Sequence, residues 1–307
     1  MNGSIKLPSI FFSVRARKLA KKCSRGVCFL ECFPHVERLR KTILLGLCLS
    51  GLAQYSFAIG RARYVEVVPR PGSFTIVHGK MLAGICVDPS DYKGVVRAAG
   101  DLQADVDRVT GHRPRVVGVE ANNVKANLGT NTIVVGTIGK NAVIDRLIRE
   151  QKIDVTAIAG KWESFLIQVV PHPTPGVEIG LIIAGSDKRG TIYGIYDLSE
   201  QIGVSPWYWW SDVPVAHKDA LFVKAGRYIQ GPPAVKYRGI FLNDEAPSLA
   251  GWAHEKYGNL NHQMYEKVFE LLLRLKANYL WPAMWNNAFN EDDPLNPKLA
   301  DEYGIVM

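Results

Sequence analysis

Cysteine is scarce in most of this sequence. Four of the five cysteines lie within the first 58 residues, and only Cys86 lies beyond them. A single cysteine forms no internal disulfide bond, so we expect residues 59–307 to fold without one. Cys23, Cys28 and Cys32 stand in a basic stretch without a fourth ligand at a zinc-finger spacing. We therefore expect no metal ion there.

An excess of charge is also missing from most of the chain. The sequence carries 37 Lys or Arg and 29 Asp or Glu, a net charge of +8. Residues 1–58 contain ten of the basic and two of the acidic residues, so residues 59–307 are neutral. A neutral globular part has no overall charge for holding phosphate groups, so we expect no nucleic-acid partner. At 47% hydrophobic residues, the chain suffices for one large domain or two ordinary ones.

The apolar run at residues 42–53 is shorter than the roughly 20 residues of a transmembrane helix. Arg38-Leu39-Arg40-Lys41 precedes it, and Ser56-Phe57-Ala58 follows, small at the two positions that a signal peptidase reads. We therefore predict that residues 1–58 are an N-terminal extension with a secretory signal, and that the protein is extracellular without a stable membrane anchor. Residues 1–30 are basic, lack acids and also resemble a mitochondrial presequence, which is the alternative.

Residues 59–235 alternate between strand-like and helix-like patterns. Apolar stripes at three- and four-residue spacings predict helices from Tyr92 to Val109 and from Arg189 to Ile202, closed by Gly111 and Gly203. Short apolar runs between them predict strands at 74–77, 116–119, 132–135, 165–170 and 179–184. This alternation indicates an α/β layer domain.

Two glycine-containing turns in this region resemble ligand loops. Residues 136–140 lack the spacing of a phosphate loop, so we predict a plain strand-to-helix turn and expect no cofactor. In residues 185–190, Asp187 is placed to cap a helix, or else Lys188 or Arg189 faces an acidic sugar as a substrate-binding residue. The aromatic run at 205–210 favours packing between domains over sugar stacking.

Residues 236–307 repeat a strand–helix rhythm. Strands are predicted at 236–242, 277–280 and 304–307, with helices at 261–275 and 293–303 between them. Asn261 is placed to cap the first of these helices. The order is typical of a (β/α)₈ barrel or a doubly wound sheet. A barrel needs about 250 residues, so we expect the first part of a catalytic barrel, cut within that domain.

Polar and aromatic side chains follow the two predicted strands, where barrel active sites lie. Glycoside hydrolysis needs two carboxyl groups, and tryptophan rings offer flat apolar faces to sugars. A single acid here would instead suggest a structural pair with Arg238 or a helix cap. His254 and His262 lack metal-ligand spacing and are expected to face solvent or to form hydrogen bonds. The candidate residues are Asn243, Asp244 and Glu245 after the first strand, Trp281 and Trp285 after the second, and Glu255 in the following loop.

Longer motifs carry a resemblance to a known family. RGIFLNDE, GW…EK…NH…YEKVFELLLRLKANYLWPAMW and DDPLN…ADEYGIVM resemble glycoside hydrolase family 115, as do AAGDLQADVDRVTG and GSDKRGTIYGIYDLSEQIGVSPWYWWSDVPV. The resemblance covers about residues 62–307. It implies an α-1,2-glucuronidase that removes glucuronic acid, or its 4-O-methyl form, from glucuronoxylan or its oligosaccharides with inversion. It also implies an α/β domain, a (β/α)₈ barrel and C-terminal domains that help form a homodimer in the full-length protein.

The resemblance also implies site residues. Asp244, Glu245 and Glu255 fall in the family's acidic motif and the following loop, and Trp281, Trp285 and Asn286 fall in its second strand motif. The general acid and base stay unassigned among the three carboxylates. Later barrel segments of the family, including a His-His-Glu segment, are absent here, so we expect no turnover by this chain alone.

Two other interpretations stay open from the sequence. A β-hexosaminidase-like glycosidase would use an adjacent Asp-Glu pair, as at Asp244 and Glu245, although the tryptophan motif suits it less well. The second of these interpretations is that the chain is a catalytically inactive sugar-binding remnant.

Overall fold

The computed structural model describes residues 63–118, 129–243, 246–282 and 284–307. Residues 62–307 form one compact unit. The predicted signal segment lies outside the described residues, so secretion stays a prediction. None of the described helices is both long enough and apolar enough to span a membrane.

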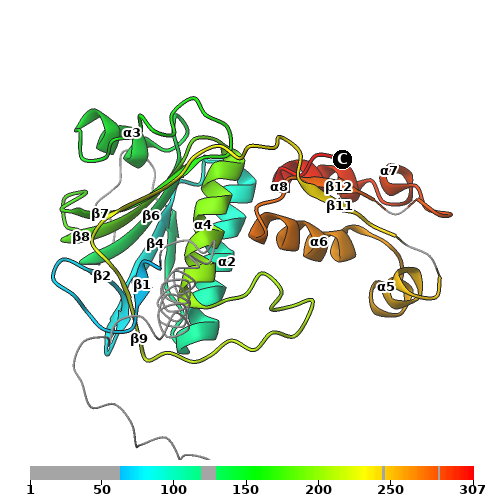
Figure 1. Ribbon diagram of the computed structural model, residues 1–307, viewed down its shortest axis with the longest axis horizontal. Helices are drawn as coiled ribbons and strands as arrows, with labels where there is room; N and C mark the ends of the chain where they lie inside the picture. Colours follow the sequence, from blue (N-terminus) through cyan, green and yellow to red (C-terminus); the bar gives the residue numbers. More distant parts are fainter. Residues whose placement is uncertain (1–62, 119–128, 244–245, 283) are drawn as a thin grey trace, which may run out of the picture. The chain divides into compact units, whose positions relative to one another are not determined.

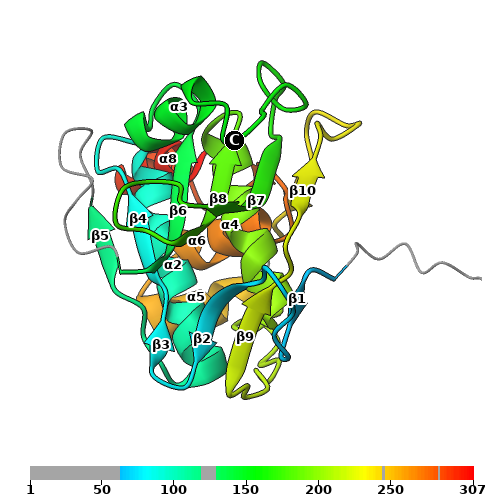
Figure 2. The ribbon, with the colours of Figure 1, turned by 90° about the vertical axis from the view of Figure 1, so that its left-hand side faces the viewer.

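A six-stranded sheet lies at the centre of the first region, in the order β10-β7-β8-β6-β4-β5 (Figure 2). Four neighbouring strands are parallel, whereas β7 runs antiparallel to β8, and β10 runs antiparallel to β7. The strands are β4 (Gly84–Val87), β5 (Val116–Gly118), β6 (Asn131–Thr137), β7 (Phe165–Pro171), β8 (Ile179–Gly185) and β10 (Arg227–Gln230). Every residue of β6 is buried, as expected for a parallel strand with both faces covered.

Helices cover both faces of this sheet. On one face, α2 (Lys93–Thr110) and α4 (Lys188–Ile202) pack against each other and against the strands (Figure 1). On the other face, α3 (Ala142–Arg149) closes a second apolar cluster. Gly111 and Gly203 end α2 and α4 with positive φ angles, as predicted from their positions after the apolar stripes. The predicted α/β layer architecture is therefore confirmed.

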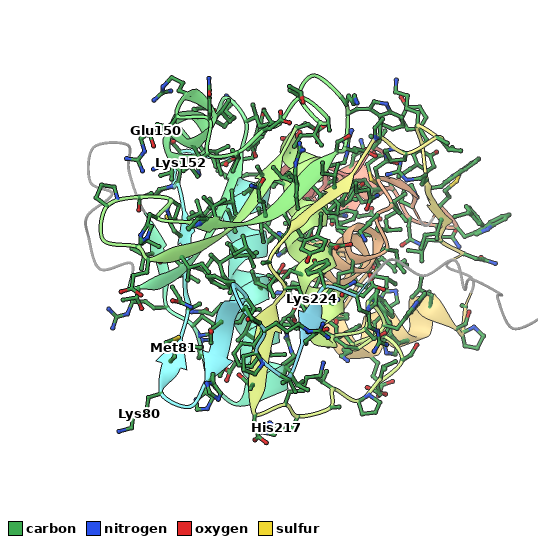
Figure 3. All side chains as sticks on the ribbon, turned by 60° about the vertical axis from the view of Figure 1, so that its left-hand side comes forward. Lys80, Met81, Glu150, Lys152, His217 and Lys224 are labelled. Carbon is green, nitrogen blue, oxygen red and sulfur yellow. The ribbon has the colours of Figure 1, made fainter. Side chains whose placement is uncertain are left out.

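A smaller antiparallel sheet adjoins this layer, in the order β1-β9-β2-β3. Its strands are β1 (Val65–Glu66), β2 (Phe74–His78), β3 (Met81–Leu82) and β9 (Ala220–Val223). Only β2 is expected from the sequence pattern, because the other three strands have two to four residues each. Lys80 lies in the turn between β2 and β3, and Met81 begins β3 (Figure 3).

The C-terminal region has the predicted strand–helix order. The parallel strands are β11 (Gly239–Phe241) and β12 (Tyr279–Trp281), joined by α5 (Leu249–Tyr257) and α6 (His262–Arg274). The chain continues through α7 (Phe289–Asp292) and α8 (Leu295–Tyr303), and then Val306 forms a parallel bridge with Tyr279. The described residues thus form the first strands of a (β/α) arrangement, without a closed barrel.

The C-terminal region packs on the outer side of α2 and α4 (Figure 1). Apolar residues of α2, α4, α6 and α8 belong to one continuous core. At the start of α2, a side chain added to Gly94 would collide with the backbone oxygen of Glu302 at the end of α8. The absence of a side chain at Gly94 therefore lets α8 approach α2.

We predict that Gly94→Ala lowers the free energy of unfolding by about 1–3 kcal/mol, because the new methyl group forces α8 away from α2. Urea unfolding of the purified chain measures this change. Gly100→Ala is the matched control: this glycine lies in the same helix with nothing near its missing methyl group, so alanine should stabilise by about 0.5–1 kcal/mol. Equal effects of the two substitutions would contradict the close approach.

Candidate functional site

Aromatic side chains cluster at the carboxyl ends of β11 and β12. The backbone amide of Leu242 donates to the carbonyl oxygen of Trp281 at 2.9 Å, so the two strand ends lie side by side. The rings of Phe241 and Trp281 meet edge to face, with centroids 5.6 Å apart. Trp281 is 49% exposed and Trp285 is 64% exposed, although large apolar groups are usually covered. The predicted tryptophans are thus available to a flat ligand.

The turn after β12 is held in a defined conformation. The indole nitrogen of Trp281 donates to the sulfur of Met284 at 2.7 Å. Asn286 has a positive φ of 54°, which asparagine tolerates better than most residues. Asn243 and Asn286 are both exposed at these strand ends, where their amides are accessible to sugar hydroxyl groups.

The three candidate carboxylates are placed less completely. Asp244 and Glu245 lie outside the described residues; in the chain they directly follow Asn243, after β11. Glu255 is exposed and lies on α5, so the expectation of a loop at this position is wrong. The helix forms because Ala253 is fully buried and Gly258, at φ 83°, supplies a left-handed C-terminal cap. The pairing of the three candidate carboxylates as general acid and general base stays a prediction.

The cations of the 185–190 turn contact the C-terminal region. Asp187 caps α4 by accepting from the amide of Gly190 at 2.7 Å, as predicted. The Lys188 ammonium donates to the carbonyl oxygen of Asp301 at 2.7 Å, and the Arg189 guanidinium donates to that of Gly304 at 3.0 Å. Both cations therefore join α4 to the end of α8, and their assignment to substrate binding stays a prediction.

Glu163, just before β7, holds the residues that precede both candidate-site strands, and the sequence patterns did not indicate this role. Its side chain is fully buried and accepts from Arg189 at 2.6 Å, from Asn278 at 2.6 Å and from Arg238. Arg238 and Asn278 immediately precede β11 and β12, and the Asn278 side chain accepts from the Arg238 amide at 2.9 Å. One carboxylate of the α/β layer therefore fixes where both candidate-site strands begin.

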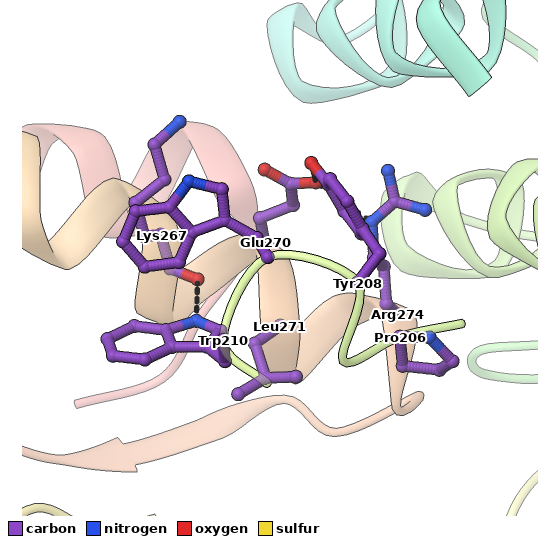
Figure 4. Close-up of a pocket in the computed structure, with 8 residues that line it drawn as sticks. Pro206, Tyr208, Trp210, Lys267, Glu270, Leu271 and Arg274 are labelled. Carbon is purple, nitrogen blue, oxygen red and sulfur yellow. Dashed lines mark hydrogen bonds and ion pairs between the residues drawn. The ribbon is translucent and has the colours of Figure 1, made fainter. Parts of the chain in front are cut away.

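The aromatic run at 205–210 packs against α6 (Figure 4), as predicted. The Trp210 indole donates to the Lys267 carbonyl oxygen at 3.0 Å, and the Tyr208 hydroxyl donates to Glu270 at 2.9 Å. Burial, followed by the negative charge of Glu270, raises the pKa of Tyr208 to about 12. Burial would raise the pKa of Glu270, but the neighbouring Arg274 guanidinium outweighs this and lowers it. The aromatic run at 205–210 therefore packs the α/β layer against the C-terminal region.

Both histidines make the expected hydrogen bonds. The Nδ1 atom of His262 lies 2.7 Å from a carboxylate oxygen of Asp293, and Nδ1 of His254 lies 3.0 Å from the Gly258 carbonyl oxygen. Across the described ranges, no group of three or more metal-binding side chains comes together.

Known proteins resemble this chain both in sequence and in structure. Residues 230–307, which contain β11, β12 and their aromatic ends, match the sequence profile of glycosyl hydrolase family 115. The predicted family resemblance is confirmed. None of the curated proteins matches this chain.

A solved structure of a family GH115 protein is similar to most of this chain. It is a family GH115 4-O-methyl-α-glucuronidase, BtGH115A, with specificity for decorated arabinogalactans. The two proteins are 33% identical with a TM-score of 0.63, over 76% of this chain and 29% of that one. An N-acetyl-β-hexosaminidase of Streptomyces plicatus is 13% identical over 80% of this chain and 46% of that chain. Its TM-score of 0.42 is too low to carry an argument for that enzyme class.

We predict that Glu163→Gln lowers the free energy of unfolding by about 3 kcal/mol, because it leaves the Arg189 and Arg238 guanidinium groups without their buried counter-charge. Thermal unfolding followed by circular dichroism measures the loss. Glu150→Gln, which changes an exposed glutamate after α3, should leave the melting temperature unchanged. A melting temperature of Glu163→Gln equal to wild type would show that Glu163 does not anchor the strands.

Proposed function

We propose that this chain is part of a glycoside hydrolase that removes side chains of glucuronic acid, or of its 4-O-methyl form, from xylan. The observation that carries the proposal is the exposed pair of Phe241 and Trp281, which end β11 and β12. Both lie within residues 230–307, which match family 115. The chain spans 29% of the length of the solved family member, so the activity, substrate and partners proposed here belong to the whole protein.

The proposed chemistry is an inverting hydrolysis by two carboxyl groups. One donates a proton to the leaving glycosidic oxygen, and the other takes a proton from the water that attacks the anomeric carbon from the opposite face. We assign these roles within Asp244, Glu245, Glu255 and any further acid that the whole protein contributes. In an inverting site the two carboxyls stand roughly 6.5–9.5 Å apart, leaving room for that water.

The aromatic side chains supply binding in this proposal. A pyranose ring has a face of C–H groups that packs on an indole ring and removes both from water. Asn243 and Asn286 flank the tryptophans with donors and acceptors for the hydroxyl groups. We further propose an extracellular location, as the secretory signal predicted for residues 1–58 implies, and a homodimer for the whole protein.

We predict that Trp281→Ala and Trp285→Ala each weaken binding of a glucuronic-acid-substituted xylotetraose about tenfold, which corresponds to about 1.4 kcal/mol of lost ring contact. Isothermal titration calorimetry with the 307-residue chain measures the dissociation constants. Trp207→Ala is the control, because Trp207 is also exposed, at 43%, but lies in the aromatic run outside the strand ends. Equal weakening by all three substitutions would contradict a sugar site at β11 and β12.

We also predict that the 307-residue chain alone releases no measurable glucuronic acid from glucuronoxylan. The strands described here form an open sheet of β11, β12 and the Val306 bridge, so their ends do not surround a substrate with two opposed carboxyl groups. Chromatography of the reaction products tests this expectation. Released acid that disappears in Asp244→Asn and Glu245→Gln would refute it and would place catalysis in this chain.

A further inference from the structure

A hollow of about 560 Å³ lies at one edge of the six-stranded sheet, apart from the candidate strand ends of β11 and β12. Its walls are the segments that follow β4 and β6. From β4 the chain passes through α2 to β5 on one side, whereas β6 pairs with β4 on the other side (Figure 2). β4 and β6 thus form a topological switch point, and the crevice at the carboxyl ends of such strands is where α/β sheets bind ligands.

One carboxylate of this hollow uses only one of its two oxygens for hydrogen bonds within the protein. Asp88, directly after β4, is only 5% exposed. Its Oδ1 atom accepts from the amide and the hydroxyl of Ser90, at 2.9 and 2.7 Å. Among the described residues its Oδ2 atom makes no hydrogen bond, and it is not one of the buried polar atoms that lack a partner, so solvent reaches it. Asp88 lines the hollow, and this carboxylate oxygen is therefore an acceptor that a ligand hydroxyl group can reach.

The opposite wall presents one cation and a second carboxylate. The Lys140 ammonium lies 5.4 Å from the centre of the Tyr92 ring, and this cation–π contact restrains the exposed lysine side chain. Asp145 uses its Oδ1 atom to accept from the Gly139 amide at 2.8 Å, and among the described residues its Oδ2 atom has no partner. The hollow thus offers two carboxylate oxygens and one ammonium group, with Pro89 and Ala142 as apolar wall.

The chemistry of the hollow disfavours anions. Two carboxylates against one ammonium group leave a net negative charge, which repels a phosphate or a uronic acid. The amides that would hold a phosphate at the start of α3 are already bound, since Asn141 accepts from those of Val143 and Ile144. No aromatic ring belongs to the lining, so a flat base or cofactor ring has no stacking partner.

We propose that this hollow binds a neutral sugar unit of a polysaccharide. Sugar hydroxyl groups donate to the free oxygens of Asp88 and Asp145 and accept from Lys140, and the C–H face packs on Pro89 and Ala142. The inference rests on the proposed function, because it takes a polysaccharide as the substrate. It assigns the uncharged backbone of the chain to the α/β layer, while the acidic side chain is assigned to the strand ends of β11 and β12.

The test uses neutral xylotetraose and the full 307-residue chain carrying Trp281→Ala and Trp285→Ala, so that the strand-end site does not contribute. Amide NMR signals of Ser90 and Gly139 should shift on titration, and Asp88→Asn should weaken the affinity at least tenfold. This substitution keeps the Oδ1 acceptor for Ser90, so the fold is retained. Lys140→Met, at an exposed side chain, should also weaken binding at least threefold.

Asp219→Asn is the control, because Asp219 is fully exposed beside His217, at the opposite end of the unit from Glu150 and Lys152 after α3 (Figure 3). It should leave the affinity unchanged. Absence of shifts at Ser90 and Gly139, or shifts with inorganic phosphate in place of xylotetraose, overturns this inference. The proposed function fails separately, if the two tryptophan substitutions leave binding of the acidic oligosaccharide unchanged.

Discussion

The buried carboxylate of Glu163 is the interaction on which the C-terminal half of the structure depends. It lies in the α/β layer, at φ 51°, a backbone conformation that glutamate seldom adopts. Its partners Arg238 and Asn278 lie just before the two candidate-site strands. β11 and β12 have three residues each, and a strand rises about 3.3 Å per residue, so fixing their starts also fixes where Trp281 and Asn243 emerge. A buried charge is costly to leave unpaired, which ties the site geometry to the fold of the first region.

A second buried network strengthens the same junction. Asp105 of α2 accepts from both terminal nitrogens of Arg274 at the end of α6, at 2.8 and 3.2 Å, and the Arg274 Nε atom donates to Glu270. These groups are almost entirely buried. Such ion pairs contribute less net stability than apolar packing of the same volume, because the charges lose their hydration. They are directional, however, so they define how α6 sits on α2, and the aromatic run around Tyr208 covers them.

Much of the layer architecture follows from local patterns, whereas the junction does not. The helices at Lys93–Thr110 and Lys188–Ile202 are predictable because an apolar stripe ends at a glycine, and both chemical features act within a few residues. The partners of Glu163 lie 26, 75 and 115 residues away along the chain, and no local pattern indicates contacts over such separations.

The same limit explains Glu255, which was expected in a loop. The helix that carries it depends on burial of Ala253 against other elements and on a cap at Gly258. The strand-end tryptophans were predictable because their positions follow from strand boundaries alone.

The helix α4 shows why the two regions form one compact unit. A helix on the surface of a layer domain buries one stripe, but α4 buries most of its residues, including polar ones such as Thr191, Asp197 and Ser199. One side contacts β6, β7 and β8, and the other contacts α6. Two buried tyrosines of α4 contact the C-terminal region: the Tyr193 hydroxyl donates to the Ala277 carbonyl oxygen at 2.9 Å, and the Tyr196 ring lies 4.5 Å from the Arg274 guanidinium. Asp197 adds an ion pair with Lys276 at 2.7 Å, so hydrogen bonds and charges hold this interface together with apolar contacts. The α/β layer therefore acts as the base on which the candidate sugar-binding strands are assembled, and its own switch-point hollow stays open at the edge of the sheet.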